Sequence, residues 1–220
     1  MTAFEGERAA SEATVRRLPM YLRFLKQLAD AGQPVVSCPQ IAAKFRLDAT
    51  QVRKDLAVTG IVGKAKVGYE IGPLITAVET FLGWNNYNDA FLVGVGHLGT
   101  ALLGYEGFRD YAFQIVAAFD TDPAKIGTVV HGREILPLAK LPDLVARMHI
   151  HLGVITVPAE AAQNVADVLT ASGITGLWNF APVMLAVPEG VIVENVQLST
   201  SLAVLTSKVR RAALSSSEET

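Results

Sequence analysis

The chain has 220 residues, half of them hydrophobic, and a formal net charge of −2. That length suits one small and one medium domain with real cores. No apolar run approaches the roughly 18 residues of a membrane-spanning helix, the N-terminus does not read as a signal peptide, and a single cysteine, Cys38, excludes an internal disulfide framework. We therefore expect a cytoplasmic protein without a membrane partner.

The small net charge conceals an asymmetry along the chain. Residues 14–72 carry ten Lys/Arg against four Asp/Glu, whereas residues 86–220 carry eight against thirteen. A basic first part followed by an acidic remainder indicates a polyanionic partner for the first part alone.

Residues 1–13 are charged and small without an apolar period, which predicts a disordered tail. Helical spacing begins near Thr14. Its apolar stripe consists of Leu18, Tyr21, Leu22, Leu25, Leu28 and Ala29. Pro19 is compatible with this helix if it lies in the first turn.

Two short helices follow. Ser37 with Gln40, and then Asp48 with Gln51, form capping-box patterns a few residues apart, and this spacing predicts a helix-turn-helix. In the second of these helices the apolar side chains point inward. The outer face then holds side chains of the kinds that read bases and phosphates in a major groove, namely Thr50, Gln51, Arg53 and Lys54. A solvated face of an ordinary helical bundle is the alternative.

A glycine-rich stretch follows the candidate recognition helix. Lys64 and Lys66 lie among three glycines and precede the strand-like residues 67–71, which predicts a β-hairpin with a basic tip. Such a tip can contact phosphates or enter a minor groove. Residues 14–84, including a further helix from Pro73 to Gly83, are therefore expected to form a winged-helix DNA-binding domain.

The next part alternates strands and helices. Strands are predicted at residues 91–93, 114–119, 151–157, 176–179 and 191–195, with helices near 98–103, 138–147 and 159–171. This alternation is typical of a Rossmann-like doubly wound parallel sheet, and we assign it to residues 85–196. The chain is thus expected to be α/β, with a winged helix first and a final helix over residues 197–214. That helix can pack on its own sheet or on another subunit. Residues 215–220 complete the chain as a tail.

A glycine motif marks the first turn of the predicted sheet. Residues 94–99 read Gly-Val-Gly-His-Leu-Gly, in which the first glycine permits a tight turn, Gly96 admits a phosphate, and Gly99 lets the helix pack close to the strand. Asp120 closes the second strand, 21 residues beyond Gly99. A carboxylate there accepts hydrogen bonds from ribose hydroxyls, which predicts NADH or NAD⁺ as the ligand. Another adenine-containing ligand is the alternative.

The sequence does not suggest an enzyme. A dehydrogenase needs an acid or base beside the nicotinamide, and no domain remains to supply a substrate site. The four histidines do not fall in a catalytic pattern, and we predict neither a catalytic residue nor a metal site. A DNA-binding module joined to a nucleotide sensor fits the parts better.

From about Thr14 to Lys208 the chain resembles the bacterial redox-sensing repressor Rex family. The resemblance rests on residues 17–23 (Arg-Leu-Pro-Met-Tyr-Leu-Arg), 51–56 (Gln-Val-Arg-Lys-Asp-Leu), 94–101, 105–108, 118–120, 122–127, 156–158, 178–182 and 193–196. It implies a homodimer with exchanged C-terminal helices that binds palindromic operator DNA and is released by NADH in competition with NAD⁺.

The resemblance also implies roles for particular residues. Arg53 and Lys54 would contact DNA. The cofactor-binding set would be Gly94, Gly96, His97, Leu98, Gly99, Asp120, Lys125, Thr156, Val157, Pro158, Asn179 and Phe180. An interdomain switch would involve Arg23, Tyr105 and Gln197.

Three positions depart from the family pattern. Thr59 stands where the family usually has an aromatic residue, Ala65-Lys66 replaces a pair ending in glycine, and Gln197 replaces an aspartate. These departures leave open a paralogous regulator with an altered redox response that senses another adenine nucleotide.

Overall fold

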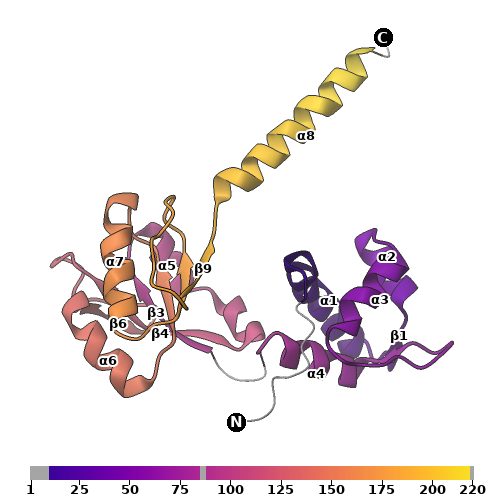
Figure 1. Cartoon of the computed structure of the whole chain (residues 1–220), viewed down its shortest axis with the longest axis horizontal. Helices are drawn as coiled ribbons and strands as arrows, with labels where there is room; N and C mark the ends of the chain where they lie inside the picture. The colour runs from indigo at the N-terminus through magenta and orange to yellow at the C-terminus, as the bar shows by residue number, and fades with distance from the viewer. Residues whose placement is uncertain (1–9, 85–87, 219–220) are drawn as a thin grey trace. The chain divides into compact units, whose positions relative to one another are not determined.

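The computed structural model describes residues 10–84 and 88–218, and it divides the chain into two compact units, Met1–Tyr87 and Asn88–Thr220 (Figure 1). Three predicted parts lie partly outside the described residues: residues 1–9 of the N-terminal tail, residues 85–87 at the start of the second predicted domain, and residues 219–220 of the C-terminal tail.

The first unit is a small helical domain with a two-stranded sheet. Its elements are α1 (Glu12–Asp30), β1 (Val35–Val36), α2 (Cys38–Phe45), α3 (Ala49–Ala57), β2 (Tyr69–Glu70) and α4 (Ile71–Phe81). The predicted helix-turn-helix is present as α2 and α3. Ser37 forms a reciprocal capping box with Gln40, as predicted. At the start of α3 the prediction was half wrong, because Asp48 accepts bonds from the Thr50 and Gln51 N–H groups while the Gln51 side chain turns to Asp55.

Helix α1 contradicts the expectation for Pro19. The helix begins at Glu12, so Pro19 lies well past the first turn. A proline inside a helix costs about 3 kcal/mol. Burial of Leu18, Tyr21 and Leu22, each no more than 1% exposed, outweighs that cost, because each large apolar side chain contributes roughly 2 kcal/mol.

The predicted wing is also built differently. Strand β2 pairs with β1 in antiparallel fashion, so the strand-like segment after Lys66 does not form the second arm of a hairpin. The hairpin itself is reduced to a turn closed by a bridge between Lys64 and Gly68. Gly68 is required there, because a Cβ on it would lie 2.3 Å from the Val36 carbonyl oxygen.

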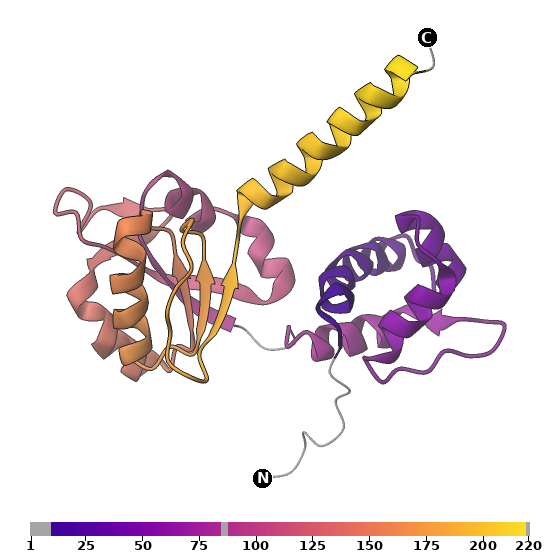
Figure 2. The ribbon, with the colours of Figure 1, turned by 45° about the horizontal axis from the view of Figure 1, so that its top comes forward.

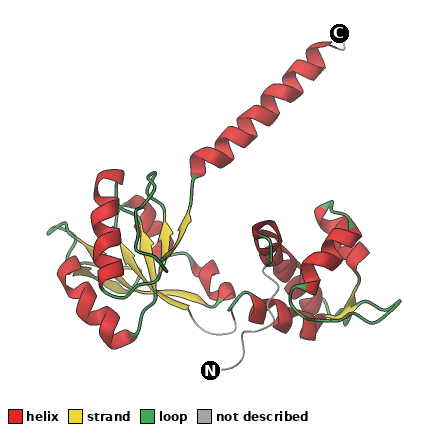
Figure 3. Cartoon of the chain, in the orientation of Figure 1, coloured by secondary structure: helices red, strands yellow, loops and turns green. Residues whose placement is uncertain are grey.

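The second unit is a seven-stranded sheet between layers of helices (Figures 2 and 3). Its strands are β3 (Asn88–Val93), β4 (Phe113–Asp120), β5 (Val129–Val130), β6 (Arg133–Pro137), β7 (Leu152–Ile155), β8 (Gly176–Asn179) and β9 (Ile192–Asn195). Its helices are α5 (His97–Leu103), η1 (Glu106–Tyr111), η2 (Leu138–Lys140), α6 (Leu141–Met148), α7 (Ala159–Ala171) and α8 (Leu198–Glu218). The predicted α/β class and parallel sheet are confirmed.

The strand order is β5-β6-β4-β3-β7-β8-β9, and every pair is parallel except β5 with β6. Without the short β5, this is the order 3-2-1-4-5-6 of dinucleotide-binding folds, whose direction reverses between β3 and β7. Strands β5 and β6 were missed by the sequence prediction, and the predicted helix over residues 138–147 is split into η2 and α6.

Both faces of the sheet are covered. On β3, Phe91 and Val93 pack into one core with α6 and α7, whereas Ala90 and Leu92 pack into the other core with Leu103 of α5. Successive residues of a strand point to opposite faces. Because both faces are covered, consecutive residues of a strand are buried. The strands therefore have continuous apolar sequences in place of an alternating pattern.

Helix α8 extends beyond the predicted end at residue 214. Three large side chains form an apolar stripe along this helix, and all three are exposed: Leu202, Leu205 and Val209, at 59%, 58% and 61%. In residues 10–84 and 88–218, no helix is long and apolar enough to cross a membrane.

Candidate functional site

The glycine motif lies where β3 ends and α5 begins. Gly94 has a φ of +103°, and a Cβ there would lie 2.9 Å from the Thr156 carbonyl oxygen and 2.6 Å from the Val157 side chain. A Cβ on Gly99 would lie 2.1 Å from the carbonyl oxygen of Gly94. These two glycines permit a tight turn and a close approach of helix to strand, which are the structural roles that the sequence predicts for them.

Gly96 is different, because a Cβ built on it meets nothing within 4 Å. It is the N-cap of α5, and no side chain caps the first N–H groups of the helix. Gly96, His97 and Leu98 are exposed. The packing of this chain therefore does not require glycine at position 96, whereas a ligand that approaches the backbone does.

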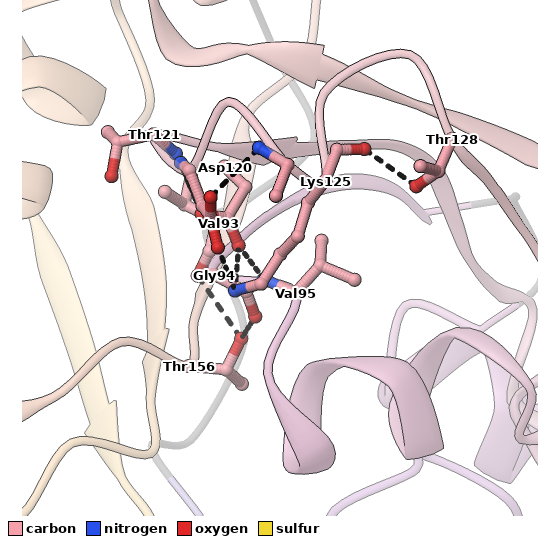
Figure 4. A network of polar contacts seen from close by, with 10 residues as sticks. Val93, Gly94, Val95, Asp120, Thr121, Lys125, Thr128 and Thr156 are labelled. Carbon is pink, nitrogen blue, oxygen red and sulfur yellow. Dashed lines mark hydrogen bonds and ion pairs between the residues drawn. The ribbon is translucent and has the colours of Figure 1, made fainter.

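Asp120 binds the glycine loop to the end of β4 (Figure 4). One carboxylate oxygen accepts the N–H of Val95 at 2.8 Å and the Lys125 ammonium at 3.0 Å, and the other accepts the N–H groups of Thr121 and Asp122. Burial raises the pKa of Asp120, but these hydrogen bonds and the Lys125 charge outweigh it and hold the pKa below its ordinary value. Asp120 is therefore ionised at neutral pH.

The other predicted cofactor residues follow the next strands at the same edge of the sheet. Thr156, directly after β7, donates its hydroxyl to the carbonyl oxygens of Gly94 at 2.7 Å and Val93 at 3.1 Å. Asn179 ends β8 and is fully buried, with its amide donating to Val183 and Asn195. Its side chain is thus used within the protein. Phe180 is half-buried and packs against Trp178.

Four of the predicted DNA-binding residues belong to α3, and three of them lie on its exposed face. Thr50, Arg53 and Lys54 are exposed, while Val52 and Leu56 are fully buried. A cavity of about 560 Å³ lies between Arg53 and the wing. Gln51 is instead half-buried and donates to Asp55 at 2.8 Å, so its expected place on the outer face was wrong.

A buried carboxylate that the sequence reasoning missed joins α3 to α1. Asp55 is fully buried and accepts hydrogen bonds from four side chains at 2.6–3.1 Å, with a bidentate guanidinium among them: Thr14, Arg17, Tyr21 and Gln51. Two features of the sequence indicate this network. Arg17 and Tyr21 are four residues apart and so share one face of α1, and Asp55 lies between the apolar positions Val52 and Leu56 on the inward side of α3.

The wing holds the two predicted basic residues in different states. Lys64 forms an ion pair with Glu70, so its charge is compensated. Lys66 is exposed, and its backbone has a φ of +63°. The lysine that replaces the usual glycine is therefore in the left-handed conformation, which costs a side chain about 1 kcal/mol.

Replacing Lys66 with glycine is expected to raise the free energy of unfolding of the first unit by about 1 kcal/mol, because glycine adopts this conformation without a steric penalty. Urea denaturation followed by circular dichroism measures the change. Lys66→Ala is the control, since it removes the same charge but keeps a Cβ. An equal gain in both variants would show that backbone strain is not the cause.

The predicted switch residues lie in both units. Arg23 is exposed on α1. In the second unit, Tyr105 is 56% exposed before η1, and Gln197 accepts a bond from the Thr200 hydroxyl at the start of α8. In the part of the chain that the structure describes, no group of His, Cys, Asp and Glu is arranged to hold a metal ion.

Comparison with known proteins identifies the parts. Residues 10–57 match the family model described as a putative DNA-binding protein N-terminus, and residues 85–183 match the one described as a CoA binding domain. The chain is 43% identical over 197 residues to the redox-sensing transcriptional repressor Rex of Bacteroides fragilis, covering 88% of each chain. It is 44% identical over 200 residues to the Rex of Carboxydothermus hydrogenoformans, covering 91% of this chain and 96% of that one.

Solved structures of a Rex-family repressor superpose on this chain over nearly its whole length. The Rex-family repressor RSP in complex with NAD⁺ and operator DNA superposes with a TM-score of 0.87 at 32% identity, covering 96% of this chain and 97% of that one. RSP in complex with NADH superposes with a TM-score of 0.84, also at 32% identity, covering 95% and 98%. These relatives are transcriptional repressors, so the expectation of a regulator in place of an enzyme is confirmed. The extent and identity of these matches show that the chain belongs to the redox-sensing transcriptional repressor family Rex.

Proposed function

We propose that this protein represses transcription by binding operator DNA through its first unit and that NADH, in competition with NAD⁺, controls this binding through its second. The observation that carries the proposal is the bond between the Val95 N–H and Asp120. It joins the two halves of a dinucleotide fingerprint at the reversal point of the sheet, in a chain that also carries a winged helix.

Within this proposal, the pyrophosphate of the dinucleotide lies against the exposed backbone of Gly96, His97 and Leu98, where a Cβ on residue 96 meets no protein atom. Asp120 binds the adenosine ribose. A carboxylate offers about four acceptor positions, and four donors already occupy those of Asp120. The ribose hydroxyl therefore displaces Lys125, which is 39% exposed, since the other three donors are backbone N–H groups.

The nicotinamide end lies near Thr156, Val157, Pro158 and Phe180, with Asn179 shaping the pocket from beneath. Oxidised nicotinamide carries a positive charge and the reduced ring carries none, so an apolar pocket disfavours the oxidised form through desolvation. The cofactor can shift the regulator between its DNA-binding and released states only by the difference in its affinity for the two states. A shift of their ratio from 99:1 to 1:99 takes about 5.5 kcal/mol.

Thr50, Arg53, Lys54 and Lys66 are the residues that we propose contact DNA, with Gln51 acting through Asp55 and Lys64 contributing less because of its ion pair. The exposed stripe of α8 supports a homodimer, because Leu202, Leu205 and Val209 line one side of a helix and are each more than half exposed, which suits an interface with a second copy. A symmetric dimer accounts for a palindromic operator. We place the protein in the cytoplasm, where the DNA and the NAD(H) pool are.

An operator-binding assay across NADH/NAD⁺ ratios tests the proposal. Increasing the NADH fraction at constant total cofactor is expected to release the protein from DNA. Equal effects of both forms on DNA affinity would reject redox sensing while leaving DNA binding intact.

Gln197 is expected to weaken the switch. It can form hydrogen bonds with Arg23 and Tyr105 but cannot supply the charge of the family's aspartate. Gln197→Asp is therefore expected to show a larger difference in DNA affinity between the NADH-bound and NADH-free protein than the natural chain, measured by titrating DNA release with NADH. Indistinguishable titration curves would contradict this role.

A regulator that senses another adenine nucleotide is the second candidate. The Lys125 ammonium beside Asp120 is 39% exposed and supplies a positive charge that can pair with a nucleotide phosphate. Calorimetry with NADH, NAD⁺ and ATP separates the two candidates. Tighter binding of ATP than of NADH would favour the second.

A further inference from the structure

A cavity of about 330 Å³ lies beside the end of α5, away from the glycine loop. Its walls come from η1, the start of β4 and the turn between β5 and β6. Strand β4 runs from Phe113 at this cavity to Asp120 at the cofactor edge. At about 3.3 Å per residue, the two sites are roughly 20 Å apart.

The cavity collects positive charge in an acidic domain. Three arginines occur between residues 88 and 197, and Arg147 pairs with Asp143. The other two, Arg109 and Arg133, both line the cavity. Within residues 10–84 and 88–218, neither is in an ion pair, and Arg133 donates to the His131 carbonyl at 3.3 Å. Glu106 is the one acidic residue in the lining, so the lining is net positive.

The backbone holds one wall of the cavity in place. His131 and Gly132 form a two-residue turn with φ values of 46° and 77°, the geometry that suits a tight hairpin. The His131 ring lies directly on Gly104, where a Cβ would come within 2.5 Å of it. The absence of a side chain at residue 104 leaves room for the imidazole at this wall of the cavity.

Polar and apolar side chains share the rest of the lining, with Tyr105 and Gln114 on the polar side. An apolar patch lies among them. Leu103 and Ile115 form it together with the rings of Phe108 and Phe113, which stack edge to face at 5.0 Å. Binding pockets for small molecules combine such an apolar patch with a few convergent polar groups. Guanidinium groups bind carboxylates and phosphates through paired hydrogen bonds.

We propose that this cavity is a second ligand site, which binds a small organic anion: a carboxylate or phosphate held by Arg109 and Arg133, attached to an aromatic or aliphatic group that lies on Phe108 and Phe113. The site is separate from the dinucleotide site and does not depend on the function proposed above.

Calorimetry on the full chain, with and without NADH, tests this site. The probes are phenyl phosphate and benzoate, and benzyl alcohol is the neutral match. We expect at least one anion to bind with a dissociation constant in the millimolar range or below, and benzyl alcohol to bind at least about tenfold more weakly. Arg109→Gln and Arg133→Gln are each expected to weaken anion binding about tenfold or more. Arg147→Gln removes an equivalent charge outside the cavity and is expected to leave anion binding unchanged.

Three results would overturn the proposal: neither anion binds at millimolar concentration, benzyl alcohol binds as well as the anions, or Arg147→Gln weakens binding as much as the cavity variants. Circular dichroism of each variant establishes that it is folded. Competition by NADH for the same probe would also reject a separate site, and it would do so whether or not NADH controls DNA binding.

Discussion

Replacing Asp55 with alanine is expected to lower the free energy of unfolding of the first unit by about 3 kcal/mol or more and to weaken operator binding with it. Asp55 is fully buried between α1 and α3 and receives both arms of the Arg17 guanidinium. Breaking a buried pair by removing one partner leaves the other uncompensated. Here it would also leave the buried Tyr21 hydroxyl without its acceptor.

Asp48→Ala is the matched control for this prediction. Asp48 caps the same helix from an exposed position, and loss of a cap costs about 1 kcal/mol. Urea denaturation measures both variants, and fluorescence anisotropy with labelled operator DNA measures binding. If Asp55→Ala is no more destabilising than Asp48→Ala, the buried network does not hold α3 on α1.

The same carboxylate predicts how stability depends on pH. Burial raises the pKa of Asp55, but hydrogen bonds from Arg17, Tyr21 and Gln51 outweigh burial and lower the pKa below its ordinary value. A lowered pKa in the folded state means that the contribution is complete above the unfolded value, near 3.9, and is lost as the pH falls through the folded one. Asp55→Asn is therefore expected to flatten the loss of stability below about pH 4.

Periodicity predicted most of the fold because the apolar patterns are strong. The strand over residues 176–179 and the helix over 159–171 were predicted with their observed bounds, since each is an uninterrupted pattern between breakers. Strand β6 was missed because only Ile135 of its five residues is buried, so its sequence carries little apolar signal. Helix α8 shows the other limit, because an apolar period predicts a helix but does not identify the surface against which Leu202, Leu205 and Val209 pack.

The residues of the candidate site could be predicted from the sequence at positions where close backbone contacts leave room for glycine alone. Gly94 and Gly99 are required by close contacts within the chain, and a spacing motif records such contacts directly. The positions of Gln51 and Lys64 were not predictable in this way. Each lies on a polar face by sequence. Gln51 bonds to Asp55 one turn further along α3, and the missing information was that Asp55 is buried against α1. Lys64 pairs with Glu70, which only the fold of the wing places beside it.

Gly96→Ala is expected to leave the fold intact and to weaken NADH binding by about tenfold or more, equivalent to 1.4 kcal/mol or more. The added methyl group meets no protein atom, so its structural cost is limited to a poorer N-cap, about 1 kcal/mol or less. In the proposed complex, however, it occupies the space in which the pyrophosphate approaches the backbone. Calorimetry with NADH and thermal unfolding of the same sample separate the two effects.

Two further glycine variants decide what a loss of binding means. Gly99→Ala places a Cβ 2.1 Å from the Gly94 carbonyl oxygen, so it is expected to reduce stability and NADH affinity together. Gly72→Ala, in α4, also meets nothing within 4 Å, and it is expected to change neither the fold nor NADH affinity. A loss of affinity in Gly96→Ala at nearly unchanged stability would therefore identify residue 96 as the point of ligand contact. Unchanged affinity in that variant would place the dinucleotide elsewhere, because the loop itself has room for the methyl group.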